Sequence, residues 1–171
     1  MRIFTWKKVW SIPALVVAII IVADQWTKYI VLKSTDLNFG GQIEVIPSFF
    51  RIVRVRNPGA AWGILPNYTW LLALISGVVF ILMTIFFNRL TSDLKERCIG
   101  ASLMMGGIAG NLIDRVWYGS VIDFLSFNYK SFEWPAFNVA DSAICIGVAL
   151  ISISSFLRPD QLNTSHVAVQ P

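Results

Sequence analysis

Long stretches without a charged residue alternate with short polar segments along the chain. The uncharged stretches cover residues 9–23, 57–88, 98–113 and 142–157. A helix that crosses the hydrocarbon core of a membrane needs about 20 mostly apolar residues, and polar groups are tolerated near its ends. The pattern therefore predicts four transmembrane helices, at approximately 12–33, 68–88, 97–116 and 138–157, and a polar tail over 158–171.

The segment between the first two helices, residues 34–66, has a different pattern. Val53 and Val55 alternate there with Arg54 and Arg56, and a period of two residues is typical of a half-buried β-strand. We expect a small β-sheet and loops that rest on one surface of the membrane. The arginines either form a solvated strand face or contact lipid phosphates, and the pattern does not decide between these alternatives.

Composition agrees with a mainly α membrane protein. Of the 171 residues, 56% are hydrophobic and 14% are charged, whereas about a quarter of the residues of a soluble domain are charged. The length suits one domain over residues 1–171. The net charge is +4, but the basic residues are scattered, so we expect no binding to nucleic acid.

Two further observations argue against a cleavable leader and against a metal site. Basic residues at positions 2, 7 and 8 precede the first apolar stretch, but that stretch lacks a small-residue cleavage pattern and continues into Asp24, so we expect it to be retained. His166 lies in the polar tail, and Cys98 and Cys145 are far apart, so a zinc site of the usual type is hard to assemble. We expect neither a metal nor another cofactor.

Four crossings would place both termini on one side and would gather polar residues on the other. The first and third helices run toward this far side and the fourth begins there, while Asp123 lies in the loop between the third and fourth helices. Lys and Arg are slightly more frequent on the side of the termini, so the positive-inside rule favours cytoplasmic termini. The helix residues that converge on the far side are Asp24, Asn111, Asp114, Arg115, Asn138 and Asp141.

Asp123 and Asp141 are the candidate catalytic pair. Carboxylates at membrane depth are costly and usually functional, and two acids that share one proton can activate a water molecule for hydrolysis. Asn138 and Asp141 also fit a structural role, as the N-cap and an acid in the first turn of a helix. The two interpretations are compatible, because a helix dipole favours an ionised Asp141 and leaves Asp123 to hold the proton.

The other polar residues of the far side also allow two interpretations. Asp24 and Lys28 are four residues apart, so they either form an ion pair within a helix or position the catalytic region. We expect Asp114 to pair with a neighbouring helix. Asn111 and Arg115 share a helix face, from which they can bind a peptide carbonyl or a carboxylate. A serine nucleophile activated by Lys28 is disfavoured, because Lys28 already has Asp24 as a neighbour.

Small residues indicate two places of close backbone approach. Ser102, Gly106 and Gly110 recur every four positions and predict a helix face that packs closely against another helix. The segment 57–63, with the sequence Asn-Pro-Gly-Ala-Ala-Trp-Gly, combines a turn-forming start with small residues. Its backbone is therefore expected to approach another group closely.

Five motifs in this order resemble the lipoprotein signal peptidases, or signal peptidase II family, which are membrane aspartyl peptidases. The motifs lie at 24–28, 57–63, 106–115, 121–124 and 137–142, and no motif position departs from the family pattern. The resemblance implies that Asp123 and Asp141 are the catalytic pair. The residues that it implies bind substrate or order the site are Asn57, Gly59, Asn111, Arg115, Asn138, Ala140, Asp24 and Lys28.

The resemblance also implies a substrate and a location. The substrate would be a prolipoprotein whose signal peptide is cut just before a diacylglyceryl-modified cysteine, amid membrane lipids. Residues 1–171 would form a single membrane-embedded peptidase domain, functional as a monomer, in the bacterial cytoplasmic (inner) membrane, with its site near the extracytoplasmic face. The alternatives are a small proton-coupled transporter, which four spans without an internal repeat disfavour, and a non-enzymatic scaffold.

Overall fold

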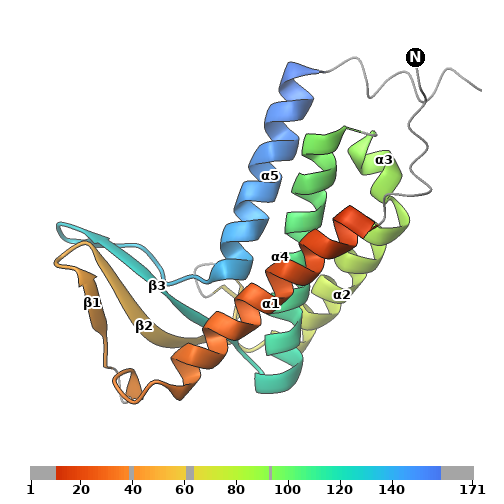
Figure 1. Ribbon diagram of the computed structural model, residues 1–171. Coiled ribbons are helices and arrows are strands. Elements are labelled where there is room, and N and C mark those ends of the chain that lie inside the picture. Colours follow the sequence, from red (N-terminus) through yellow and green to blue (C-terminus); the bar gives the residue numbers. More distant parts are fainter. Residues whose placement is uncertain (1–10, 39–40, 61–63, 93, 159–171) are drawn as a thin grey trace, which may run out of the picture.

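A bundle of helices with a small β-sheet at one end makes up the computed structural model (Figure 1). The structure describes residues 11–38, 41–60, 64–92 and 94–158. The helices are α1 (Ser11–Lys33), α2 (Thr69–Ile85), the short α3 (Phe87–Thr91), α4 (Lys95–Tyr118) and α5 (Val139–Leu157). The strands are β1 (Ile43–Ile46), β2 (Phe50–Asn57), β3 (Val121–Tyr129) and β4 (Phe132–Glu133).

The four predicted helices correspond to α1, α2, α4 and α5, with ends that differ by a few residues. The second helix was predicted to reach residue 88, but α2 ends at Ile85 and α3 begins at Phe87. Among the described residues, α1 and α5 are long and apolar enough to cross a membrane, whereas the apolar α2 has 17 residues. The predicted tail beyond Arg158 lies outside the described residues.

The direction of the helices brings the sheet to one end of the bundle. α1 and α4 end near the sheet, and α2 and α5 begin there (Figure 1). The short helix α3 lies at the opposite end (Figure 1). Counting the crossings predicted that the first and third helices end on the side where the fourth begins, and the structure confirms this arrangement.

The sheet is larger than predicted, and the segment expected to be a loop around Asp123 is a strand. The strand order is β1-β2-β3-β4, with antiparallel neighbours. The predicted strand near Val53 is β2, and it pairs with β3 so that Val55 lies opposite Asp123. The first four residues of β3 are all buried. This segment therefore lacks the alternation of polar and apolar residues by which a half-buried strand is recognised.

Two arginines of β2 are bound within the protein. Arg51 donates to Gln42 Oε1 at 2.9 Å and also pairs with Glu133. Arg54 donates to Asn38 Oδ1 at 2.7 Å. Two of the three arginines of this strand therefore have polar partners within the protein, and the third, Arg56, is exposed.

Small residues on α4 let neighbouring helices approach closely. A Cβ atom added to Gly106 would lie 2.7 Å from the Cβ of Ile20 on α1, and one added to Gly110 would lie 2.6 Å from Asp24 Oδ2. These distances confirm the predicted close-approach face. Gly107 extends the close packing to α5, where an added Cβ would lie 2.3 Å from the backbone oxygen of Ala140.

Gly107→Ala is expected to lower the free energy of unfolding by about 1–3 kcal/mol, the usual range for overpacking. The new methyl group would collide with the backbone of α5. Gly77→Ala on α2 is the matched control, because a Cβ at this position meets nothing within 4 Å and alanine favours a helix more than glycine does. Thermal unfolding of both purified variants in detergent is the measurement, and equal melting temperatures would contradict the close contact.

Candidate active site

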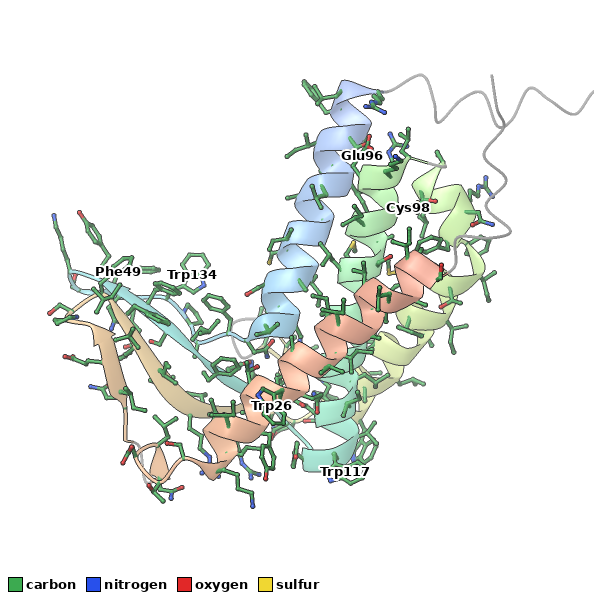
Figure 2. All side chains as sticks on the ribbon, in the orientation of Figure 1. Trp26, Phe49, Glu96, Cys98, Trp117 and Trp134 are labelled. Carbon is green, nitrogen blue, oxygen red and sulfur yellow. The ribbon has the colours of Figure 1, made fainter. Side chains whose placement is uncertain are left out.

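The polar residues of the candidate site gather at the sheet end of the bundle. Helices α1 and α4 contribute their last turns, α5 contributes its first turn, and β2 and β3 contribute strand residues. In Figure 2, Trp26 and Trp117 mark this end of the bundle, and Glu96 and Cys98 mark the opposite end. Segments far apart in the sequence therefore build one site.

Asp141 is held by the first turn of α5. Asn138 is the N-cap of the helix, as predicted, and its Oδ1 accepts a bond from Asp141 N at 2.9 Å. In return, Asp141 Oδ2 accepts from Asn138 N at 3.1 Å, which completes a capping box. Asp141 Oδ1 accepts from Asn111 Nδ2 on α4 at 2.8 Å. Both oxygens thus act as acceptors, the role that an ionised carboxylate plays in hydrogen bonds.

Asp123 lies on β3 and has an exposed fraction of only 3%. Its Oδ1 accepts from Asn138 Nδ2 at 2.8 Å, and its Oδ2 accepts from Asn57 Nδ2 at 3.1 Å. Burial and then the negative charge of Asp141 raise the pKa of Asp123 to about 6, although the two amide bonds act in the opposite direction. Asp123 therefore keeps a proton at a pH at which an exposed aspartate has lost it.

Asn138 contacts both acids and is completely buried. Its backbone N–H reaches Asp141, and its side-chain Nδ2 reaches Asp123. The same Nδ2 lies 3.2 Å from Asn111 Oδ1 and 3.3 Å from the backbone oxygen of Ile122. Its two amide protons are therefore shared among three acceptors, of which Asp123 Oδ1 is the third. One rigidly held residue therefore sets the relative position of the two carboxylates.

An ion network lies behind the acids. Lys28 Nζ is 2.7 Å from Asp24 Oδ2 and 2.8 Å from Asp114 Oδ2, and it also donates to Asn111 Oδ1 at 3.1 Å. The lysine side chain is 2% exposed and both aspartates are 0% exposed. These contacts confirm the predicted Asp24–Lys28 pair and the predicted pairing of Asp114 with a neighbouring helix. Because three acceptors surround the ammonium group, Lys28 is not placed to activate a serine.

The ion network is bonded to the elements that carry the acids. Asp24 Oδ1 accepts from Ala140 N at 3.0 Å, and Asp114 Oδ2 accepts from Ile122 N at 3.0 Å. Gln25, which the sequence pattern did not single out, donates to Asp114 Oδ1 at 2.9 Å and to a backbone oxygen of α4 at 3.2 Å. The one sequence feature that could have identified Gln25 is that it places a second polar side chain beside Asp24 in an apolar helix.

The end of β2 forms another wall of the site. Asn57 Oδ1 accepts from Gly59 N at 3.0 Å, which closes a local turn. Arg115 Nη2 donates to the oxygen of Gly59 at 3.2 Å, and its Nη1 donates to the oxygen of Asn111 at 3.3 Å. Arg115 thus ties this turn to α4, on the helix face that it was predicted to share with Asn111. Residues 61–63 of the predicted turn segment lie outside the described residues.

A cavity of about 1030 Å³ opens beside the two carboxylates. Its polar side includes Asp123, Asp141 and Arg115, and most of its other lining residues are apolar. Figure 2 shows two of the aromatic lining residues, Phe49 and Trp134, near the far end of the sheet. The cavity is large enough for a peptide segment or an apolar chain beside the acids. Among the described residues, no group of three or more His, Cys, Asp or Glu side chains is arranged to hold a metal.

The structure combines apolar helices that suit a membrane with two carboxylates, the buried Asp123 and the half-buried Asp141, beside an apolar cavity. These features together define a class, the membrane-embedded aspartic peptidases. Comparison with protein families agrees with this class and narrows it. The family model for Signal peptidase (SPase) II matches residues 16–157. The chain therefore belongs to the signal peptidase II family, the aspartic-type lipoprotein signal peptidases.

Individual relatives cover most of the chain. It is 41% identical over 150 residues to the lipoprotein signal peptidase of Geobacter metallireducens. The alignment covers 86% of this chain and 91% of the relative. It is 40% identical over 157 residues to the lipoprotein signal peptidase of Shewanella loihica. That alignment covers 90% of this chain and 91% of the relative. A bacterial membrane enzyme solved by the in meso method at 2.3 Å superimposes with a TM-score of 0.78 at 35% identity, covering 95% of this chain and 96% of that chain. These likenesses favour the peptidase over the transporter and the scaffold.

Proposed function

We propose that Asp123 and Asp141 carry out the cleavage of signal peptides from prolipoproteins. Asp141 takes a proton from a water molecule as the water oxygen attacks the scissile carbonyl, while protonated Asp123 donates a hydrogen bond to the carbonyl oxygen. When the C–N bond breaks, the proton on Asp141 passes to the leaving amine. The observation that carries the proposal is the contact of Asn138 with both carboxylates at the wall of an apolar cavity.

The surroundings of the two acids support this division of roles. Burial and the charge of Asp141 raise the pKa of Asp123 to about 6, which suits the acid that holds a proton. Asp141 accepts hydrogen bonds from Asn111 and from the backbone of Asn138, which suits the acid that is ionised. Two carboxylates in unlike environments are a common basis for acid and base roles in one site.

We assign the other candidate residues to two groups by their place in the structure. Residues that line the cavity would contact the substrate backbone, and residues buried behind it would position the acids. The cavity group is Asn57, Asn111 and Arg115, and the positioning group is Gly59, Asn138, Ala140, Asp24 and Lys28. Gln25 joins the second group through its bond to Asp114.

The value of kcat/KM is expected to fall as the pH rises through about 6, because Asp123 then loses the proton that the mechanism requires. Asn57→Ala should move this decline to higher pH by about half a unit to one unit. The Asn57 amide lies 3.1 Å from Asp123 Oδ2 and favours the charged carboxylate, so its removal raises the pKa further.

The measurement is the pH profile of kcat/KM for the wild type and for the variant. Asn38→Ala is the control, because Asn38 is exposed and bonds to Arg54 outside the site. Only the position of the decline is diagnostic, since a lower rate at every pH can follow from damage to the turn at Gly59. A decline that stays in place or moves to lower pH in Asn57→Ala would contradict the role of Asp123.

The proposed placement in the membrane follows from the helices and the aromatic residues. We expect α1, α2, α4 and α5 to cross the bacterial inner membrane, with cytoplasmic termini and the sheet end at the extracytoplasmic face. Trp26 and Trp117 are exposed at the site end, with exposed fractions of 63% and 79%, as expected for side chains at a membrane interface (Figure 2). We further expect the whole chain to act as one domain and as a monomer.

We propose that the cut falls just before a diacylglyceryl-modified cysteine. The apolar walls of the cavity beside the acids support this substrate, because they can receive the diacylglyceryl chains from the surrounding lipid. The test is to incubate the purified protein with a lipid-modified precursor and with the same precursor lacking the modification. Cleavage of the modified form alone is the expected result. Equal cleavage of both forms would contradict the proposal that the enzyme recognises the diacylglyceryl group.

A further inference from the structure

A second cavity lies at the opposite end of the bundle from the carboxylate pair. It has a volume of about 660 Å³ and lies among α2, α3, α4 and α5. Its walls are largely apolar side chains, such as Leu82 of α2, Leu90 of α3 and Phe86 between these helices. Its polar lining includes Arg89 and Arg97. Within the residues that the structure describes, it shares no lining residue with the cavity beside Asp123 and Asp141.

Arg97 is the residue that points to a ligand. It lies in the first turn of α4 and is completely buried. Its Nε donates to Ser154 Oγ at 3.0 Å, and its Nη2 lies 3.4 Å from the oxygens of Ser154 and Arg158. Its Nη1 is buried and has no hydrogen-bond partner among the described residues. A buried donor of a charged group that lacks an acceptor is costly, so an acceptor from outside the chain would be strongly favoured there.

The carboxylate next to Arg97 in the sequence is already paired. Glu96 accepts from Ser154 Oγ at 3.2 Å and forms an ion pair with Arg158 Nη1 at 3.2 Å. Within the described part of the chain, no Asp or Glu lines this second cavity. Among its described lining residues, the cavity therefore combines the guanidinium groups of Arg89 and Arg97 with hydroxyl groups and without a carboxylate, which is the chemistry of an anion site.

We propose that this second cavity binds the phosphate group of an anionic phospholipid, with Arg97 Nη1 as the buried donor. Guanidinium groups match phosphate oxygens in geometry and charge, and basic pockets between membrane helices suit lipid headgroups. The apolar wall formed by α2 and α3 favours a lipid over a free phosphate ion, because an acyl chain can lie against it. In the proposed topology this end faces the cytoplasmic leaflet, and the site is separate from the peptidase reaction.

Native mass spectrometry of the full-length protein, released from detergent, tests the ligand. The probes are phosphatidylglycerol, a diacylglycerol with the same chains, and glycerol phosphate. We expect one phosphatidylglycerol to bind, and the other two probes to bind at least about tenfold more weakly, because each lacks the phosphate or the chains. Equal binding of diacylglycerol would overturn phosphate recognition, and equal binding of glycerol phosphate would overturn the lipid as the occupant.

Variants at this cavity test the location. Arg97→Gln should weaken the binding of phosphatidylglycerol at least about tenfold, since it removes the charged donor. Arg97 also holds the end of α5, so a second variant leaves it in place: Ser155→Trp fills the cavity from α5. Ser152→Trp is the matched control, because Ser152 is exposed on the same helix and does not line the cavity. Weaker binding in Ser155→Trp alone supports the site, and equal affinity of the two tryptophan variants would overturn it.

Discussion

Asp123→Asn and Asp141→Asn are each expected to leave a folded membrane protein that cleaves a lipid-modified precursor at least about 10²-fold more slowly, and up to about 10⁴-fold. Asparagine keeps the size of the side chain but cannot take a proton from water. Its amide N–H is also a much weaker acid than a carboxylic O–H, so it stabilises the charge that develops on the carbonyl oxygen less well. The measurement is the initial rate of precursor cleavage by purified variants, at a pH at which the wild type is active.

The control for these variants is an aspartate outside the site. Asp36 is exposed, and Asp36→Asn should cleave at the wild-type rate. Thermal unfolding of all three variants separates a loss of chemistry from a loss of fold. Wild-type cleavage by either Asp123→Asn or Asp141→Asn would remove that residue from the catalytic pair.

Lys28→Met is expected to lower the free energy of unfolding by about 3–5 kcal/mol, the usual cost of removing one partner from a buried ion network. The ammonium group bonds Asp24 and Asp114, both of which are completely buried, and it also bonds Asn111. Its loss leaves two carboxylates without their cation. Because Asp24 also accepts from the backbone of Ala140, the start of α5 should lose order as well.

Chemical denaturation in detergent micelles measures this effect. Lys33→Met is the matched control, because Lys33 lies in the last turn of the same helix and is exposed. Its removal should change the free energy of unfolding by less than about 0.5 kcal/mol, as is usual for a surface residue. If both variants were equally stable, Lys28 would not hold the two aspartates in the way that the distances indicate.

The helices of this fold and the end at which the polar residues meet could be predicted from the sequence. A membrane-spanning helix can be recognised from its own segment of sequence, because a long enough uncharged stretch is by itself stable as a helix in the bilayer. Counting crossings then places Asp24, Asn111 and Asp141 at one end without knowledge of any contact. Pairs at helical spacing, such as Asp24 with Lys28, are local for the same reason.

The strand that carries Asp123 could not be predicted in this way. β3 pairs with β2, in which Val55 lies opposite Asp123 across a long separation in sequence. Burial of its first residues removes the alternation that marks a half-buried strand. The bond from Asn138 to Asp123 depends on this strand pairing. The contact that links the two acids could therefore not be predicted from the pattern of any one sequence segment either.

The capping box of α5 has a consequence for the reaction cycle. Asp141 Oδ2 accepts from the backbone N–H that starts the helix, and Oδ1 accepts from Asn111. In the proposed mechanism, a proton that Oδ2 takes from water weakens its bond to this N–H, and a helix cap is worth about 1 kcal/mol. The intermediate is thus the state in which α5 is least well capped. Transfer of the proton to the departing amine restores the cap, so product formation and repair of the helix start are one event.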